Sequence, residues 1–535
     1  MSKYIEKIGL LCADIENELS IYHDYVSDDL INKTNTLLIL ADIGPKLCQT
    51  AIKVQLEEIM ARVNITRYAK VWMYSARIQL EPEAGLLKEL LEYIISEQEF
   101  SVNVKFFLYY QTIWVSQVYS GVNHEDIMCL QWKLYNQVLQ GFKSKLEDLL
   151  EPVPEEERDE NMALVITGQM SGPGHAPTRR TLDRCEMLIK MNKKVFLINT
   201  AEFLSSVGSI PYYGSKEGVY NSDLLKYEKI EWKDVSFSFF QAEKNMPNMA
   251  GLRLLLEMIQ KIKPGIVISV GASILADLVN DIMPVLTIGL SASRIAYTNT
   301  ACQTLSRELQ AADLQLLNKF GLNQNNIIRS VSNFTMPDQL ESVTREQIGL
   351  PEDKFILAIS GDRLREELDK KFVDMLCQAV DDDMVIVLLG DMDISEHRIG
   401  QPQELKNKIY SLGWVTDFLS RIELCDLYVN PCRRGAGTMS VMALVKGKPV
   451  VTVPYGDAAV NVGEDFWTES YETMPDLIRR YKNDADFYHS MSVKAKERAA
   501  VLLDAENEFR NVLREFKKRT NSCQDVPYSK GALHD

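Results

Sequence analysis

A glycine-rich loop followed by a predicted helix is the segment best suited to bind a phosphate. Residues 430–457 begin Asn-Pro-Cys-Arg-Arg-Gly-Ala-Gly-Thr, and a helix is expected directly after Gly435–Thr438. The first turn of a helix carries unpaired backbone N–H groups at the positive end of the helix dipole, a geometry that suits a diphosphate. Gly437 and Thr438 are therefore candidate phosphate-binding residues. A tight turn needed only for packing is the alternative.

Charged residues flank this loop on both sides. Arg433 and Arg434 come directly before it and would neutralise phosphate charge. Asp457 follows Gly456 at the end of the next expected strand, residues 449–453. A carboxylate in that place could bind a sugar hydroxyl or cap the following turn, and the sequence does not favour either.

Two further candidate segments, around Arg363 and Val415, lie before the glycine-rich loop in the chain. Arg363 comes after a strand predicted over 355–359, and its planar guanidinium suits a phosphate. A surface salt bridge to a neighbouring carboxylate is the alternative. Val415 lies in the segment Gly-Trp-Val-Thr-Asp, whose backbone could hydrogen-bond a nucleotide base. A simple turn explains that segment equally well.

A second loop, rich in glycine, follows the strand predicted over 162–167. It contains Gly172, Gly174, His175 and Arg179 and ends at a helix start. Open α/β sheets bind ligands at the carboxyl ends of their strands. An imidazole titrates near neutral pH, so His175 could act as a general base on an acceptor hydroxyl or donate a hydrogen bond to a substrate. A histidine that only caps a turn is the alternative.

Composition limits the classes of function. The 535 residues suffice for roughly three domains, and 46% are apolar. The formal net charge of −16 disfavours binding to nucleic acid or to an anionic membrane. Nine scattered cysteines without a Cys-x-x-Cys pair, six scattered histidines, and the lack of a signal peptide or a long apolar run predict a cytoplasmic protein without zinc.

The pattern of apolar residues changes along the chain. Apolar residues have helical spacing in residues 1–150, and an acidic, proline-containing segment at 151–159 is expected to be a linker. Short apolar runs alternating with helical stretches follow, which predicts parallel α/β sheets. Large aromatic residues of the helical part, Trp114 among them, are expected to fill its core. The predicted divisions are a helical domain at 1–155, a first Rossmann-like domain at 156–335, a second at 336–500, a helix crossing back at 501–520 and a polar tail at 521–535.

Residues 160–515 resemble bacterial nucleotide-sugar glycosyltransferases of the GT-B type. The most specific part is 427–515, which includes Gly-Glu-Asp-Phe at 463–466, Tyr-Glu at 471–472 and Phe-Tyr-His-Ser-Met-Ser at 487–492. The resemblance implies two Rossmann-like domains that face each other across a cleft. The acceptor would lie on the first and the nucleotide-sugar donor on the second. An all-helical domain before this pair occurs in some protein-glycosylating enzymes of the fold.

The resemblance also assigns roles to residues of this chain. It places the donor diphosphate on the amides of Gly437 and Thr438, with Arg363 as a charge partner. It places the base near Val415. It makes His175 the residue of the first domain that is nearest to the reacting centre.

One departure from the family pattern concerns the mechanism. Retaining members often carry two glutamates eight positions apart around the glycine loop, where this chain has Arg434 and Met442. Met442 removes the expected contact with the donor ribose. An unmodified retaining mechanism is therefore disfavoured, and loss of catalysis is an open alternative.

The leading hypothesis is a hexosyl- or N-acetylhexosaminyl-transferase that needs neither a cofactor nor a metal. It would move a sugar from a nucleoside diphosphate, expected to be UDP, to a protein or a cell-surface glycan. The alternative is a non-catalytic GT-B-like subunit that binds a protein substrate or a partner glycosyltransferase, with peripheral membrane or subunit contact left open. A sugar-nucleotide epimerase of the same fold is a third reading, but its acid/base carboxylates cannot be placed.

Overall fold

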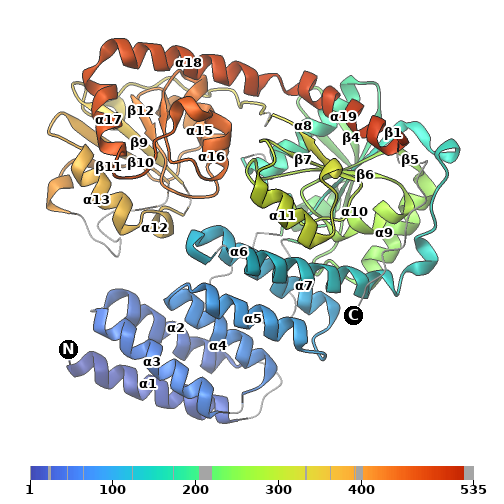
Figure 1. The fold of residues 1–535 in the computed structure, drawn as a ribbon, viewed down its shortest axis with the longest axis horizontal. Coiled ribbons are helices and arrows are strands. Elements are labelled where there is room, and N and C mark those ends of the chain that lie inside the picture. Colours follow the sequence, from blue (N-terminus) through green and yellow to red (C-terminus); the bar gives the residue numbers. More distant parts are fainter. Residues whose placement is uncertain are drawn as a thin grey trace.

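The computed structural model places a block of helices before two α/β units (Figure 1). The first unit contains one sheet of the structure, and the second unit contains the other. The structure describes residues 2–21, 26–44, 46–63, 65–122, 124–172, 174–203, 220–331, 334–361, 363–390, 392 and 402–522.

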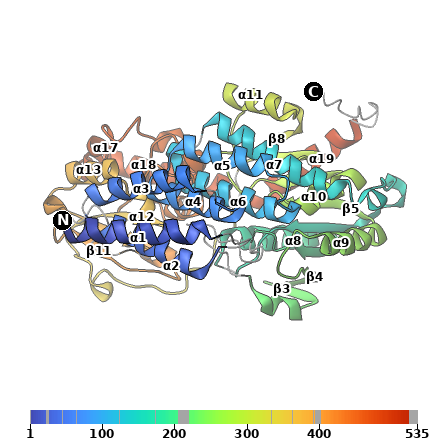
Figure 2. The same cartoon turned by 90° about the horizontal axis from the view of Figure 1, so that it is seen from below.

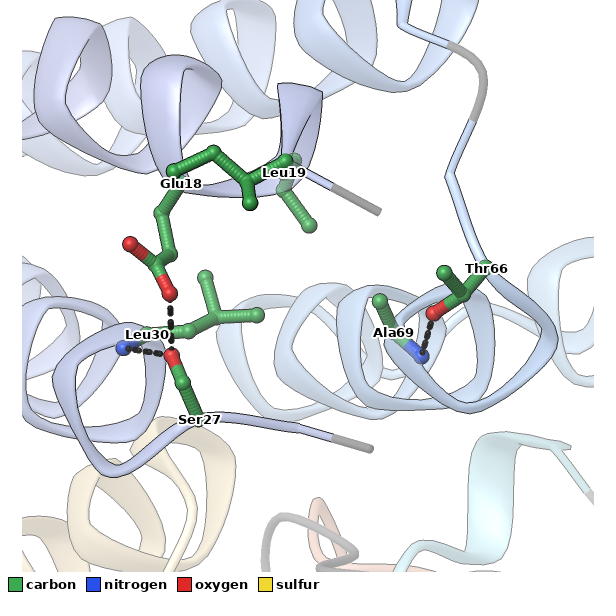
Figure 3. Close-up of a pocket in the computed structure, with 7 residues that line it drawn as sticks. Glu18, Leu19, Ser27, Leu30, Thr66 and Ala69 are labelled. Carbon is green, nitrogen blue, oxygen red and sulfur yellow. Dashed lines mark hydrogen bonds between the residues drawn. The ribbon is translucent and has the colours of Figure 1, made fainter. Parts of the chain in front are cut away.

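Seven α-helices form the N-terminal part. They are α1 (Ser2–Ser20), α2 (Asp28–Ile43), α3 (Lys46–Arg62), α4 (Arg67–Leu80), α5 (Ala84–Ser96), α6 (Val102–Val118) and α7 (Glu125–Lys143). Two hydroxyls cap helix starts, because Ser27 Oγ accepts from Leu30 N at 3.1 Å and Thr66 Oγ1 accepts from Ala69 N at 3.4 Å (Figure 3). The cavity beside these caps measures about 10 Å³, which leaves room for at most one water molecule.

The helical part consists of two packing groups. Helices α1–α4 enclose one apolar core, whereas α5–α7 share a core with the first sheet and its helices. Polar contacts fix this second group, since Tyr135 Oη donates to Asp277 Oδ2 at 2.7 Å and Trp132 Nε1 donates to Phe320 O at 3.1 Å. The later helices of the N-terminal part are thus bound to the first α/β unit.

The first sheet has eight strands in the order β3-β4-β2-β1-β5-β6-β7-β8, all parallel except for β3. Its strands are β1 (Asp159–Thr167), β2 (Lys194–Asn199), β3 (Lys229–Trp232), β4 (Val235–Gln241), β5 (Pro264–Val270), β6 (Val285–Ile288), β7 (Cys302–Leu305) and β8 (Ile327–Arg329). Helices α8 (Ala176–Lys190), α9 (Met249–Ile262), α10 (Ile274–Ile282) and α11 (Ala311–Phe320) connect them. The inner strands are buried on both faces, as the continuous apolar runs predict.

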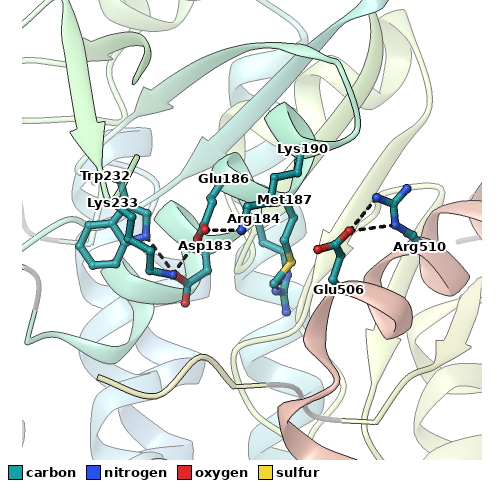
Figure 4. Close-up of polar contacts among 9 residues, drawn as sticks. All are labelled: Asp183, Arg184, Glu186, Met187, Lys190, Trp232, Lys233, Glu506 and Arg510. Carbon is teal, nitrogen blue, oxygen red and sulfur yellow. Dashed lines mark hydrogen bonds and ion pairs between the residues drawn. The ribbon is translucent and has the colours of Figure 1, made fainter. Parts of the chain in front are cut away.

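The β3–β4 hairpin is tied to α8 by polar contacts (Figure 4). Lys233 Nζ lies 2.7 Å from Glu186 Oε2 and 3.1 Å from Asp183 Oδ1. Trp232 Nε1 also donates to Asp183 Oδ1, at 3.0 Å. These contacts hold an edge of the sheet that the sequence did not predict.

The second sheet has five parallel strands in the order β11-β10-β9-β12-β13. They are β9 (Phe355–Ser360), β10 (Met384–Leu389), β11 (Ile409–Ser411), β12 (Leu427–Val429) and β13 (Val450–Val451). The helices of this unit are α12 (Leu364–Glu367), α13 (Lys370–Ala379), α14 (Phe418–Ile422), α15 (Gly437–Val445), α16 (Gly456–Val462), α17 (Met474–Asn483) and α18 (Ala485–Leu503).

The last helix, α19 (Ala505–Ser522), returns to the first unit (Figure 1). Helix α18 packs on the second core through Ala495 and Ala499, and α19 packs on the first through Phe509, which is 1% exposed. The Arg184 guanidinium lies 5.0 Å from the centre of the Phe509 ring. The helical conformation is interrupted at Asp504, which separates α18 from α19.

The predicted fold class is confirmed by the strand orders of the two sheets. Three local expectations differ. The strand predicted over 449–453 is reduced to β13, and β7 and β8 were not predicted. The linker is anchored, since Val153 is buried and its N–H donates to Ile282 O at 2.9 Å. The domain limits remain predictions, and residues 523–535 of the predicted tail lie outside the described residues.

In the part of the chain that the structure describes, no helix combines the length and the apolar character needed to cross a membrane.

Candidate functional site

The second sheet brings its predicted site residues together at the carboxyl ends of β9, β12 and β13. Arg363 follows β9, and the glycine loop follows β12. They are close, because a Cβ at Gly435 would lie 3.4 Å from Arg363 Nη2. Gly456, after β13, has φ +77°, and a Cβ there would lie 2.1 Å from Arg433 O. The third strand end therefore packs directly against the loop, as expected at the ligand-binding edge of an open α/β sheet.

The start of α15 is open to a ligand. Ala436 adopts a left-handed conformation, with φ 62°, and its side chain provides no cap. Among the described residues, the backbone N–H groups of Gly437, Thr438 and Met439 have no hydrogen-bond acceptor. A Cβ at Gly437 would lie 2.5 Å from Nδ2 of Asn461, a side chain that is 2% exposed and has an unpartnered Oδ1. Donors thus converge where the sequence predicted a diphosphate.

Arg433 is a structural residue. Its Nε donates to Asn430 Oδ1 at 2.8 Å, and its Nη1 lies 2.6 Å from Glu367 Oε2. Its Nη2 donates to Ser360 O at 2.6 Å and to Tyr428 Oη at 3.1 Å. The guanidinium is buried and committed to protein partners, so it serves the architecture of the loop rather than a ligand.

The next residue, Arg434, differs from Arg433 in its partners. It is only 6% exposed, and its Nε donates to Tyr455 Oη at 3.1 Å. Its two terminal nitrogens, Nη1 and Nη2, are buried and lack a hydrogen-bond partner among the described residues. Burial and the neighbouring Arg294 lower the pKa of Arg434. A buried cation of this kind is costly unless an anion pairs with it.

The first unit contributes further cations to the same region. Arg294, in the loop after β6, lies with its guanidinium 6.0 Å from the centre of the Tyr297 ring. Helix α8 carries Arg179 and Arg180 in its first turns. Burial lowers the pKa of Arg180, and the nearby carboxylate of Asp457 opposes that shift. Arg180 and Arg294 of the first unit thus lie near Asp457 and Arg434 of the second.

Asp457 joins the two units. Its Oδ1 accepts hydrogen bonds from Ser291 Oγ at 2.7 Å, from Ser293 Oγ at 2.7 Å and from Ser293 N at 3.0 Å. Its own N–H donates to Arg434 O at 2.8 Å. We call these contacts the Asp457 bridge. One oxygen of this predicted donor-binding residue is therefore occupied by the first unit.

Arg363 lies between the second α/β unit and the helical part. Its Nη2 lies 3.0 Å from Glu367 Oε1, so Glu367 pairs with both Arg363 and Arg433. The Arg363 guanidinium also lies 5.5 Å from the centre of the Trp114 ring, on α6. The salt bridge expected as an alternative exists, but it lies below the surface, with the Arg363 and Glu367 side chains 13% and 4% exposed. Trp114, predicted to fill the helical core, instead lies against the second unit.

His175 occupies the position directly before α8. Its Nδ1 lies 2.9 Å from Thr178 Oγ1, which also accepts from Ser171 N at 3.0 Å. A Cβ at Gly172 or Gly174 would meet no atom within 4 Å, so the loop borders open space. His175 therefore has a capping position and a partly exposed ring, and its catalytic role stays a prediction.

Glu202, after β2, is a titratable residue that the sequence did not single out. It is 2% exposed, its Oε1 accepts from Ile274 N at 3.2 Å, and its Oε2 has no partner among the described residues. Burial, assisted by the negative charge of Asp277, raises the pKa of Glu202 to about 8. A Cβ at Gly168 would lie 3.3 Å from Glu202 Cγ, so the carboxyl lies beneath the His175 loop.

Val415 lies in the turn between β11 and α14 and is partly buried. Gly413 has φ 64°, and its carbonyl accepts from Gly390 N at 2.9 Å. The neighbouring Trp414 is 71% exposed. The turn predicted as an alternative is present, and base binding at Val415 remains a prediction.

The residues that sequence reasoning missed are Trp114, Arg180, Glu202, Arg294 and Asn461. None lies in a local motif that binds phosphate, and each reaches the site through tertiary packing. Two of them had a nearby signal, since Arg180 directly follows the predicted Arg179, and Asn461 follows Asp457 by one helical turn on α16. No group of three or more metal-binding side chains occurs within the described ranges.

No protein-family model matches the chain. A segment of 190 residues is 27% identical to acetate kinase from Macrococcus caseolyticus (strain JCSC5402), covering 32% of this chain and 44% of that protein. The chain therefore spans less than half the length of this curated relative.

Several solved structures are similar in outline. A glycosyltransferase from Rickettsia africae ESF-5 gives a TM-score of 0.48 at 15% identity, covering 68% of this chain and 99% of that one. A mutant O-GlcNAc transferase from Thermobaculum terrenum gives a TM-score of 0.48 at 12% identity, covering 98% of this chain and 100% of that one. Anabaena HepE, solved with UDP and glucose, gives a TM-score of 0.45 at 16% identity, covering 68% of this chain and 100% of that one. TM-scores below 0.5 do not by themselves define a shared fold.

Proposed function

We propose that the chain is a glycosyltransferase that uses a nucleoside-diphosphate sugar, with UDP as the expected nucleotide. The observation that carries this proposal is the pair of buried terminal nitrogens of Arg434, which have no hydrogen-bond partner among the described residues. The guanidinium lies next to the open N–H groups at the start of α15 and faces Arg294 of the opposite unit. A diphosphate would supply the anion that these groups lack.

The proposed reaction replaces one bond of the donor sugar with another. The bond between its anomeric carbon and the diphosphate oxygen breaks, and the acceptor oxygen bonds to that carbon. The leaving diphosphate gains negative charge, which Arg434 and the N–H groups of Gly437 and Thr438 would stabilise. Arginines and N–H groups supply this charge, so the proposal includes no metal ion or cofactor.

His175 is the proposed base. It would accept the proton of the acceptor hydroxyl, from the open space beside Gly172 and Gly174. Its contact with Thr178 Oγ1 orients the ring at the edge of this space. The acceptor is proposed to be a protein or a glycan. The eight cysteines in the described part of the chain form no disulfide, and we propose a cytoplasmic location.

A screen of nucleotide sugars for slow hydrolysis tests this proposal. We expect the chain to hydrolyse one donor, preferentially a UDP-sugar, and to release the nucleoside diphosphate. His175→Ala should abolish transfer and keep UDP affinity within about twofold. No hydrolysis of any donor, or full transfer by the variant, would contradict the catalytic assignment.

A second function, a non-catalytic subunit that binds a protein, is favoured by one observation. Met442 is 7% exposed and belongs to the core of the second unit, so it offers no contact to a donor ribose. Absence of UDP binding together with stable association with another transferase would favour this function.

A further inference from the structure

The first sheet has a hollow at the end opposite the candidate site. Its volume is about 770 Å³, within the range of small-molecule pockets. The strands β1, β2 and β4 line it with residues near their amino ends, and the end of α9 forms its other side. Figure 2 shows the β3–β4 hairpin projecting from the molecule beside α8 and α9.

The alternation of β4 explains the hollow. Phe237 and Phe239 point to the α8 side, where each is 4% exposed. Ser236 and Ser238 point to the other face and are exposed. Because these side chains are small, the sheet surface between β3 and α9 is recessed.

The walls of this hollow are apolar. Val195 and Phe237 are buried, but most of its large apolar side chains are partly exposed, which is unusual for so many neighbouring apolar groups. They include Met162, Phe196, Met258 and Ile262.

The rim is basic. Lys193, Lys194, Lys229 and Lys261 line the hollow, and no Asp or Glu does. Lys193 Nζ donates to a backbone carbonyl, that of Glu160, at 2.8 Å. The ammonium groups of the other three have no hydrogen bond or ion pair within the part of the chain that the structure describes.

This charge is the reverse of that of the whole chain, which has 75 acidic and 59 basic residues. Glu157, in the acidic loop before β1, pairs with Lys263 outside the hollow. On β3, Glu231 lies opposite Ser236, so the four lysines of the rim lie beside this one carboxylate. An anionic group is therefore favoured at the rim, and an apolar group on the walls.

We propose that this hollow binds one molecule of a single-chain anionic amphiphile, an acyl chain that ends in a carboxylate. The chain would lie on Phe196 and Met258, and the carboxylate would lie among Lys194, Lys229 and Lys261. The surface is concave, so it receives a single molecule, whereas a bilayer is bound by apolar groups that protrude into it. The proposal is independent of the glycosyltransferase function, because the hollow lies at the amino ends of the strands.

Calorimetric titration of the full chain with octanoate, decanoate and dodecanoate, below their micelle concentrations, tests this. We expect saturable binding at one site, tightened about three- to fourfold by each methylene. Decanol should bind at least about tenfold more weakly than decanoate, because it lacks the charge.

Two triple variants separate the rim from general charge. Lys194→Gln/Lys229→Gln/Lys261→Gln should weaken decanoate binding by about tenfold or more. The control Lys133→Gln/Lys145→Gln/Lys371→Gln removes the same charge from exposed positions elsewhere and should bind as the wild type does. Ser238→Trp should also block binding, by filling the recess.

Several outcomes would overturn the proposal. They are the absence of carboxylate binding, equal losses in the two triple variants, or unchanged binding in Ser238→Trp. Lysine-dependent binding to phosphatidylserine vesicles without monomer binding would identify a membrane surface instead. Preference for an acidic peptide over decanoate would identify a protein partner instead.

Discussion

Two adjacent arginines show how burial and partners separate structure from function at the scale of single residues. The guanidinium of Arg433 is hydrogen-bonded on every side, whereas the terminal nitrogens of Arg434 are buried and unpartnered. The two side chains have the same chemistry and nearly the same exposure, 5% and 6%. Because their partners differ, we expect opposite effects on the free energy of unfolding when each arginine is replaced.

Arg433→Met should destabilise the fold by about 1–3 kcal/mol, because it leaves Asn430 and Ser360 O without their donor. Arg434→Met should leave the free energy of unfolding within about 0.5 kcal/mol of wild type, since the loss of one hydrogen bond to Tyr455 Oη is offset by removal of an unpaired buried charge. Urea unfolding of the two variants measures this. An equal loss of stability in both would show that Arg434 has a structural role.

A prediction on pH concerns Glu202. The pKa of its carboxyl is raised to about 8 in the fold, against an ordinary value of 4.5. The folded state therefore holds a proton that the unfolded chain releases. This contribution to stability is complete below about pH 4.5 and is lost as the pH rises through 8.

Glu202→Gln mimics the protonated carboxyl, so its unfolding free energy should depend less on pH. Between pH 5 and 8 the wild type should lose stability relative to the variant, by at most about 1.4 kcal/mol for each pH unit. Urea unfolding at pH 5, 6.5 and 8 measures the difference. Parallel pH profiles for the two proteins would contradict the raised pKa.

At the scale of elements, α6 connects the helical part to the candidate site through Trp114 and Arg363. Trp114→Ala should weaken UDP binding by about two- to thirtyfold, because the cation–π contact that holds Arg363 is lost. Trp114→Phe keeps an aromatic face and should retain most of the affinity. Calorimetry with UDP gives both values, and wild-type affinity in the alanine variant would rule out a role for α6 in donor binding.

The sequence predicts most elements because strong local patterns specify them. The strands β6 and β10 match the prediction at both ends, since each is a continuous apolar run. The strands β7 and β8 escaped prediction because Cys302–Leu305 and Ile327–Arg329 are short and only partly apolar. The glycine loop was found from its composition. The position of Trp114 was not, because its partner Arg363 is 249 positions away in the chain.

At the scale of the whole molecule, the Asp457 bridge joins the two α/β units. Asp457→Ala removes Oδ1, the atom that accepts the hydrogen bonds from Ser291 and Ser293. It should therefore increase the radius of gyration measured by small-angle X-ray scattering. Asp457→Asn keeps an acceptor oxygen and should remain close to the wild type. An unchanged radius in the alanine variant would show that α18, α19 and other contacts hold the units without the bridge.

The central claim is that the region around Arg434 binds the diphosphate of a nucleotide. Calorimetric titration of the wild type and of Arg434→Met with UDP and with UMP tests it most directly. We predict that the wild type binds UDP at least about tenfold more tightly than UMP, and that Arg434→Met loses this preference while UMP affinity is kept. Equal affinity of the wild type for UDP and UMP, or no binding of either, would contradict the claim.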